Sequence, residues 1–290
     1  MKAIDLYNKM DSDFKVDSIG AEDWGDLSDV KDSISDLFKK RNEGIMYDNS
    51  DEIQKVYSLT FPEPGIIQSI IDSGEENVLI FSHHAQSWRS EKKDNDFIIE
   101  MNNLPKEILQ KMKDQKISLY SLHIPLDNYS EYSTGSNFAK VIDVEVEKGC
   151  CLYLEALTGL IGKAPEKLIS RLTPIIEKHI GHEVKVYRYG SDEIKDSRIG
   201  MVTGWGTDLE ILEEMHAEGI NTFITGFTNK LPKSKGLIAA HEYAEKNCIN
   251  LIGTTHYSSE KFACKAMVEY FEKLGLPATF IEGKHHLNDL

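Results

Sequence analysis

Histidine and carboxylate side chains recur at three places where a short apolar run of this sequence ends. Six residues make up the set: His83, His84, His123, Asp127, His256 and Glu260. Imidazole nitrogen and carboxylate oxygen are common ligands of divalent first-row metal ions. Two ions held close together can share such ligands, keep positions open for water or substrate, and lower the pKa of a bound water. The set therefore predicts a site for two divalent metal ions.

The spacing within the set supports a shared site. A histidine and an acid four residues apart lie on one side of a helix, because four residues make about one turn. This spacing links His123 to Asp127, and His256 to Glu260, so each pair can bind one ion or bridge two. Adjacent side chains in an extended or turning segment diverge, which favours the neighbouring pair at 83–84 as ligands of two separate ions.

Each of these residues also has a structural interpretation. A histidine at the end of a strand is commonly held by a hydrogen bond, the pair at 83–84 can simply begin a polar loop, and the two acids can interact with the dipole at a helix start. Recurrence at three places favours the metal site. The other histidines lack this context. Structural roles on helices are expected for His179, His182, His216 and His241, and a solvated tail is expected to hold His285 and His286.

Other kinds of catalytic site have weaker support. The turn TGWGT at 203–207 could place backbone N–H groups around an anion, but it lacks the GxGxxG spacing and the P-loop lysine, so a tight strand-to-helix turn is favoured. No serine lies in a GxSxG elbow. Reduced, structural thiols are expected for the four cysteines, which have no CxxC spacing: Cys150, Cys151, Cys248 and Cys264.

Strands and helices are expected to alternate along the chain and to position these side chains. Apolar runs predict strands over 77–81, 117–122, 145–154, 184–189, 199–202, 222–225, 249–253 and 278–281. Helical periodicity predicts helices over 28–41, 66–71, 106–112, 136–142, 165–180, 209–216, 235–246 and 259–274. This alternation is typical of α/β layering. Ligand sites in such folds lie beyond the carboxyl ends of strands. The histidines of the set come just after predicted strands, and therefore at this position.

The two halves of the chain resemble each other. The segment NVLIFS at 77–82 aligns with NTFITG at 221–226, and downstream of each comes a strand that ends in a histidine with an acid four residues later. This predicts an internal duplication. A first α/β unit is expected over residues 1–143, which hold the first four members of the set, and a second over 144–290, which hold the last two. Their equivalent strand ends are expected to meet at a shared cleft.

Composition narrows the classes of function. The 290 residues suffice for one large or two ordinary α/β units. The 48 acidic against 33 basic side chains give a net charge of −15, which disfavours nucleic-acid binding because no broad basic surface is available. The first residues form no signal peptide, and no stretch reaches the roughly 20 apolar residues of a membrane span. A cytoplasmic location is expected.

Several segments together resemble the NIF-three-like proteins, a family also known as GTP cyclohydrolase 1 type 2 homologues. In chain order they are LIFSHHA, ISLYSLHIPLDN with GSNFAKVI, GWGTD, GINTFITG and LIGTTHYSSEKFA. The resemblance implies an α/β fold of two intertwined, duplicated units with mixed sheets, a dinuclear metal site between them, and a homohexamer built as a ring of dimers. It carries the ligand role onto the six residues of the set, with Glu260 as a candidate bridging ligand.

The chain also departs from the family pattern. Phe227 stands where the family has an acid after Thr-Gly, Ala85 replaces the proline that follows the histidine pair, and residues 87–103 form a polar insert. A role for the missing acid, in substrate binding or in support of the metal ligands, is therefore not expected here.

The leading hypothesis is a metal-dependent hydrolase that acts on a phosphorylated or heterocyclic small molecule, with the ion pair as its source of hydroxide. The donor set suits Zn, Fe, Mn, Co or Ni. The alternative is a non-catalytic metal-handling, adaptor or scaffold protein, which the acidic composition and the absence of a legible substrate motif favour. Nothing in the sequence specifies a guanine site, so GTP cyclohydrolase activity is a narrower version of the first hypothesis.

Overall fold

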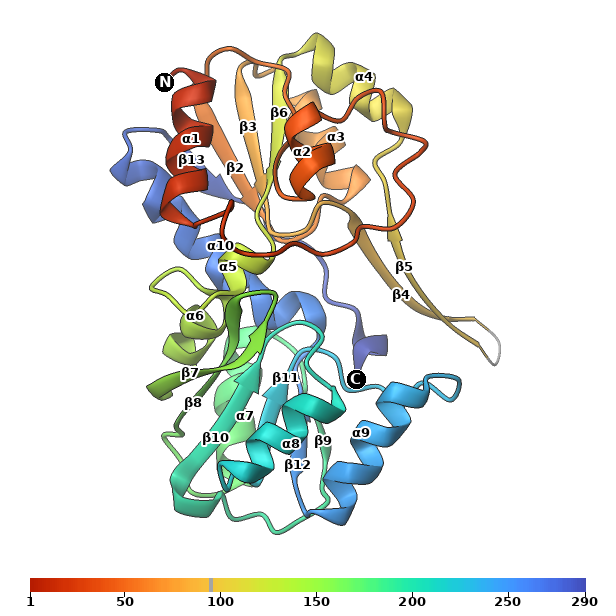
Figure 1. The fold of residues 1–290 in the computed structure, drawn as a ribbon, viewed down its shortest axis with the longest axis vertical. Coiled ribbons are helices and arrows are strands. Elements are labelled where there is room, and N and C mark those ends of the chain that lie inside the picture. Colours follow the sequence, from red (N-terminus) through yellow and green to blue (C-terminus); the bar gives the residue numbers. More distant parts are fainter. Residues whose placement is uncertain (94–95) are drawn as a thin grey trace.

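The computed structural model describes residues 1–93 and 96–290, which form a mixed α/β fold with several sheets (Figure 1). One sheet has five strands, a second has six, and a two-stranded hairpin stands beside them. The prediction of an α/β fold with mixed sheets is confirmed. No helix in the described part of the chain is long and apolar enough to cross a membrane.

The five-stranded sheet has a parallel centre. Its order is β1 (Gly44–Tyr47), β6 (Ile117–Ser121), β3 (Val78–Ser82), β2 (Lys55–Leu59) and β13 (Ala278–Phe280). All neighbours are parallel except β1 and β6. Strands β3 and β6 are buried along their whole length, as expected for central strands covered on both faces. One face packs against α1 (Ala3–Asp13) and α10 (His256–Lys273). The other packs against α2 (Asp36–Arg41), α3 (Pro64–Asp72) and α4 (Lys106–Asp114).

The six-stranded sheet has three parallel strands at its centre and antiparallel strands outside them. Its order is β7 (Glu145–Tyr153), β8 (Ala156–Lys163), β10 (Arg198–Val202), β11 (Thr222–Thr225), β12 (Asn250–Gly253) and β9 (Lys185–Tyr187). One face packs against α6 (Thr134–Val141) and α7 (Ile169–Ile180). The other packs against α8 (Leu209–Ala217) and α9 (Lys235–Lys246).

Helix α10 joins the two sheets. It begins just after β12 of the six-stranded sheet and runs onto the five-stranded sheet, where β13 then pairs with β2 (Figure 1). The Ser58 hydroxyl of β2 donates to the Cys264 carbonyl at 2.6 Å, and Phe81 of β3 packs edge-on against Phe271 at 5.6 Å. The C-terminal part of the chain therefore contributes to both the six-stranded and the five-stranded sheet. The division between residues 143 and 144 stays a prediction.

Most differences from the expected elements lie in the first 103 residues and at the helix starts, and one further strand, β8, lies later in the chain. Helix α1 and strands β1, β2 and β8 were not predicted. The polar insert forms a hairpin of β4 (Ser87–Lys93) and β5 (Asp96–Asn102). The helix expected over 28–41 is confined to α2, because the Ser35 side chain accepts from the Phe38 N–H and starts the helix there. The helix expected over 165–180 starts at Ile169. Short helical turns complete the chain: α5 (Ile124–Asp127), η1 (Lys195–Ser197) and η2 (Leu287–Asp289).

Candidate metal centre

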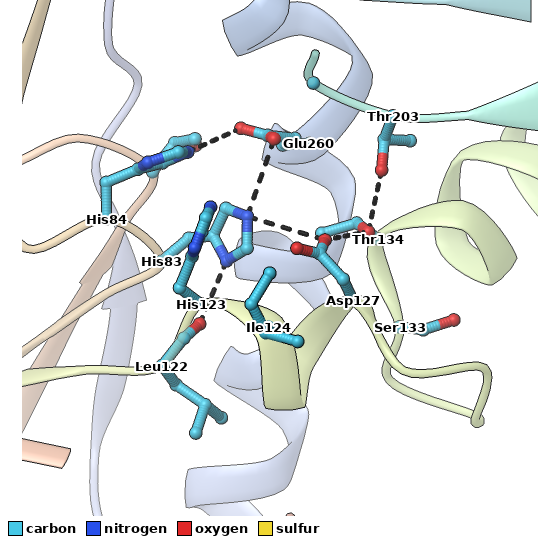
Figure 2. A network of polar contacts seen from close by, with 12 residues as sticks. His83, His84, Leu122, His123, Ile124, Asp127, Ser133, Thr134, Thr203 and Glu260 are labelled. Atoms are coloured by element: carbon cyan, nitrogen blue, oxygen red, sulfur yellow. Dashed lines mark hydrogen bonds and ion pairs between the residues drawn. The ribbon is translucent and has the colours of Figure 1, made fainter. Parts of the chain in front are cut away.

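The six predicted residues converge where the carboxyl ends of strands from both sheets meet. His83 and His84 follow β3, His123 follows β6, and His256 follows β12 as the first residue of α10. The acids Asp127 and Glu260 lie on the helical turns that begin beside the histidines, as the spacing predicted. Figure 2 shows His83 and His84 pointing toward Glu260, with Asp127 on the far side of His83. Their role as metal ligands stays a prediction.

Glu260 is the common contact of three imidazoles. Its Oε2 lies 2.9 Å from His84 Nε2, and its Oε1 lies 3.1 Å from His256 Nε2 and 3.5 Å from His83 Nε2. The residue is 2% exposed. Burial alone would raise the pKa of the Glu260 carboxyl, but His256, His84 and His83 outweigh it and hold that pKa well below its usual value. Glu260 is therefore an anion among nitrogen donors.

A backbone carbonyl orients His83. Its Nδ1 lies 2.9 Å from the Leu122 carbonyl oxygen, to which only a protonated nitrogen can donate. This leaves Nε2 facing Asp127 Oδ1 at 3.6 Å and Glu260 Oε1 at 3.5 Å, both longer than good hydrogen bonds. Burial alone would lower the pKa of His83, but the two acids raise it to about 9. Without a metal ion, Asp127 and Glu260 therefore favour the protonated, positively charged ring of His83.

Hydroxyl groups hold Asp127 in turn. The Thr134 hydroxyl donates to Asp127 Oδ1 at 2.5 Å and accepts from the Thr203 hydroxyl at 2.8 Å (Figure 2). Burial raises the pKa of Asp127 to about 6, against the lowering effect of His83. Supporting contacts of this kind orient metal-binding carboxylates in other proteins.

Two of the remaining imidazoles, those of His84 and His123, are neutral donors. Burial lowers the pKa of His84 to about 3 and the pKa of His123 well below its ordinary value. Burial alone would lower the pKa of the third, His256, but Glu260 raises it above its ordinary value. Several ring nitrogens of the set are buried and have no hydrogen-bond partner: His83 Nε2, His84 Nδ1, His123 Nδ1 and His256 Nδ1. An unpaired buried polar atom costs about 1–3 kcal/mol. The donor set therefore fits divalent metal ions, because an ion between the two acids would give the unpaired His83 Nε2 a partner.

The donors form three overlapping groups, and two of these share the Glu260 carboxylate. His83, Asp127 and Glu260 each offer a ligand atom within 4.8 Å of the others, and so do His84, His256 and Glu260. His123 joins His83 and His84 in a third group. The adjacent histidines therefore join different carboxylate-containing groups, but they also share the third group, so their role as ligands of two separate ions stays a prediction.

Two buried carboxylates position the helix starts that carry these ligands. Glu43 accepts the N–H groups of His123 at 3.0 Å and Ile124 at 3.2 Å, and so fixes the first turn of α5. Asp289 Oδ2 accepts the N–H of His256 at 3.0 Å and fixes the first turn of α10. Burial raises the pKa of the Glu43 carboxyl to about 8 and also raises that of Asp289.

A glycine turn closes one side of the centre. A Cβ on Gly204 would lie 2.2 Å from Glu260 Oε1 and 3.0 Å from His256 Nε2, so no side chain fits there. The Gly204 N–H donates to Ser259 Oγ at 2.9 Å and the Gly206 N–H to Thr225 Oγ1 at 3.0 Å. These donors of TGWGT are paired within the protein, which agrees with the tight strand-to-helix turn and not with an anion cradle.

Aromatic rings line the imidazoles. Phe61 stacks on His84 at 4.1 Å, Trp88 lies edge-on to His256 at 4.6 Å, and Trp24 lies 5.1 Å from His123. Phe227, at the position where the resemblance implies an acid, is fully buried and stacks on Trp205 at 4.2 Å. The position therefore packs an aromatic pair and offers no carboxylate.

Sequence reasoning missed the residues that support the ligands. Glu43 and Asp289 accept backbone N–H groups that are distant in sequence, and Thr134 donates to the Asp127 carboxylate from a different helix. Nothing in the sequence around these residues signals such contacts. A solvated tail was expected at His285 and His286: His285 is exposed, but His286 is half-buried. Asp289, beyond them, is fully buried and accepts the His256 N–H. His182 has the structural contact expected, with Nε2 2.9 Å from Ser258 Oγ.

Comparison with known proteins agrees with this architecture. The sequence pattern of the Duf34/NIF3 (NGG1p interacting factor 3) family matches residues 34–286. A GTP cyclohydrolase 1 type 2 homolog of Archaeoglobus fulgidus is 25% identical over 83% of this chain and 89% of the relative. The solved structure of protein ybgI, of unknown function, has a TM-score of 0.75 at 16% identity, covering 98% of this chain and 99% of that one. Protein TTHA1606 of Thermus thermophilus has a TM-score of 0.70 at 18% identity, covering 99% and 100%. These structural likenesses support the fold, and the family match over residues 34–286 shows that the chain belongs to the Duf34/NIF3 family.

Proposed function

We propose that this chain binds two divalent metal ions in the candidate metal centre and uses them to hydrolyse a phosphorylated or heterocyclic small molecule. One observation carries the proposal. The buried Glu260 carboxylate contacts His83 and His84 from the five-stranded sheet and His256 from the end of the six-stranded sheet. Such a convergence of imidazoles on one carboxylate, with the unpaired Nε2 of His83 facing it, supports metal binding.

The proposed ligands follow the two donor groups that contain Glu260. His83 and Asp127 would hold one ion, His84 and His256 the other, and Glu260 would bridge them, with His123 close to both histidines of the adjacent pair. Mixed imidazole and carboxylate donors suit Zn, Fe, Mn, Co or Ni. Metal ions bound in pairs lower the pKa of a shared water and stabilise negative charge in hydrolysis.

The protein's own contribution is to orient the ligands and to keep them dry. The Leu122 carbonyl fixes the ring of His83, and Thr134 fixes the carboxylate of Asp127. Phe61 and Trp88 cover the rings of His84 and His256, and so limit the water around them. Electrostatic interactions at the site are stronger in this low-dielectric surrounding than in water.

Turnover with defined substrates tests the hydrolase proposal. Protein loaded separately with Mn, Fe, Co, Ni or Zn is assayed against phosphoesters, cyclic amides and nucleotides, with GTP included because the relatives' name contains it. Activity with at least one metal, lost in His84→Ala and Glu260→Ala, supports the proposal. Inactivity with every metal, together with rapid transfer of the ions to a recipient, contradicts it and supports a metal-handling protein instead.

The same proposal includes a duplicated architecture. Strands β3 and β6 are parallel neighbours whose ends lead to His83 and to the pair 123/127, and β11 and β12 are parallel neighbours whose ends lead to Gly226 and to the pair 256/260. We propose that the two strand pairs are equivalent parts of two duplicated, intertwined units, with the dinuclear site between them.

Assembly into a homohexamer, a ring of dimers, is also proposed. Exposed apolar side chains near the turn between β7 and β8 give it a surface: Leu152 is 74% exposed, Tyr153 47% and Leu157 38%. Burial of such side chains against another copy would be favourable. Light scattering after size exclusion gives the mass: a hexamer supports the proposal, and a monomer contradicts it.

A further inference from the structure

Two adjacent cysteines of β7 lie side by side, outside the candidate metal centre. Neighbouring side chains of a regular strand point to opposite faces. Cys151 instead has a positive φ of 58°, a backbone conformation that costs free energy for a residue with a side chain. Both Cys150 and Cys151 are 5% exposed, and their Sγ atoms are 3.5 Å apart. The local backbone thus brings two thiols together.

A carboxylate from another element completes the cluster. Glu214 of α8 accepts the Cys151 N–H at its Oε1, at 3.0 Å. One ligand atom from each of the three residues lies within 4.8 Å of the others. Basic side chains nearby pair elsewhere: Lys148 bonds to Glu218 at 2.8 Å, and Arg198 to Glu147 at 3.0 Å.

The opposite strand leaves space for the sulfur atoms. Gly159 of β8 faces Cys150 in the β7–β8 register. A Cβ on Gly159 would lie 2.8 Å from Cys151 Sγ and 3.1 Å from Cys150 Sγ. Only a glycine lets both sulfurs keep these positions. Glu214 is exposed, so an ion can reach the cluster from solvent past this side chain.

We propose that Cys150, Cys151 and Glu214 form a separate binding site for a thiophilic divalent cation such as Zn²⁺ or Cd²⁺. Two thiolates at about 2.3 Å from a tetrahedral Zn²⁺ lie about 3.8 Å apart, close to the 3.5 Å between these sulfurs. The carboxylate is the third donor, and water can supply a fourth. None of these donors belongs to the histidine centre, so this site does not depend on the proposed hydrolase function.

Binding exchanges protons for the cation. Each thiol loses its proton as its sulfur binds, so two protons are released for one divalent ion. The hydrogen bond to Cys150 and burial both raise the pKa of Cys151. The affinity of the site should therefore fall steeply as pH decreases, because protons compete with the cation.

Titration of the reduced protein with Cd²⁺ tests this site, since sulfur-to-cadmium charge transfer gives an ultraviolet absorption that nitrogen and oxygen ligands do not. We expect the absorption to saturate with one ion per cysteine pair and to be lost in Cys150→Ser and Cys151→Ser. Glu214→Gln should weaken binding by about tenfold or more. Cys248→Ser is the matched control, because this cysteine is exposed and lies outside the cluster; it should leave the absorption unchanged. So should Glu260→Ala, which separates this test from the proposed function.

Alkylation of the wild-type protein keeps the proposal testable if the serine variants do not fold. One equivalent of Cd²⁺ should protect Cys150 and Cys151 from a thiol reagent while Cys248 continues to react, as peptide masses would show. Equal reaction of the pair with and without Cd²⁺ overturns the proposal. Absence of the charge-transfer absorption also overturns it. A disulfide between Cys150 and Cys151 in protein that was kept under reducing conditions overturns it as well.

Discussion

The Nε2 atom of His84 and the Oε2 atom of Glu260 are 2.9 Å apart, although 176 positions separate the two residues in the chain. His84 follows a strand of the five-stranded sheet, whereas Glu260 lies on the helix that enters from the six-stranded sheet. Both residues are almost fully buried. The contact therefore joins the two layers of the fold, and ions bound there should stabilise the whole structure.

Replacement of Glu260 should abolish that stabilisation. Glu260→Gln keeps the size of the side chain but removes the anion that three imidazoles contact. A ligand at one hundred times its Kd stabilises a fold by about 2.7 kcal/mol. We expect added metal to raise the Tm of the wild type but not that of Glu260→Gln, measured by calorimetry. Glu269→Gln is the matched control on the same helix, because its exposed carboxylate pairs only with Lys273 among the described ion pairs. An equal rise in Tm for both variants would count against Glu260 as a ligand.

A methyl group at Gly204 should disturb the centre directly. In Gly204→Ala the new Cβ would meet Glu260 Oε1 at 2.2 Å, so metal content should fall sharply. The positive φ of 64° adds its own cost of about 1–2 kcal/mol. Gly74→Ala separates the two effects, because Gly74 has a φ of 73° and no atom lies within 4 Å of the place that its methyl group would take. Equal metal content in the two purified variants would contradict the close approach.

The C-terminal residues should contribute to metal affinity through Asp289. In Asp289→Ala the His256 N–H loses its acceptor, and the first turn of α10 loses an anion near its positive end. Affinity should fall about 10- to 100-fold, the range seen when residues that support metal ligands are replaced. Leu287→Ala, at a position 57% exposed, should change little. Calorimetric titration with Zn²⁺ gives both affinities, and an unchanged value for Asp289→Ala would refute the positioning role.

His241 should make the fold less stable in acid. Its Nε2 donates to the Thr228 carbonyl at 2.9 Å and its Nδ1 accepts from the Tyr189 hydroxyl at 2.8 Å, which requires a neutral ring. Burial lowers the pKa of His241 from 6.5 to about 4. Between these values the folded state binds fewer protons than the unfolded state, so the free energy of unfolding falls as pH decreases, by at most about 3 kcal/mol.

Urea denaturation across this pH range measures that effect. His241→Gln can still donate to the carbonyl but does not titrate, so its stability should vary less with pH than that of the wild type. Identical slopes for the two proteins between pH 6.5 and pH 4 would exclude His241 as the source.

The set of six residues could be predicted because each follows an apolar run or lies one helical turn beyond a histidine. The supporting residues could not. Glu43 and Asp289 accept backbone N–H groups that only the tertiary fold brings close to them. Residue spacing and periodicity cannot predict contacts of this kind. The hairpin at 87–102 was missed because its strands are largely polar, and Phe61 and Trp88 gave no sign that they cover histidines.

Anomalous diffraction from crystals of untagged protein, purified without chelator, locates the bound ions, and elemental analysis of the same protein identifies them. We expect about two divalent ions beside Glu260, one near His83 and Asp127 and one near His84 and His256. Ions bound only elsewhere on the chain, or none at all after metal is added, would contradict this expectation.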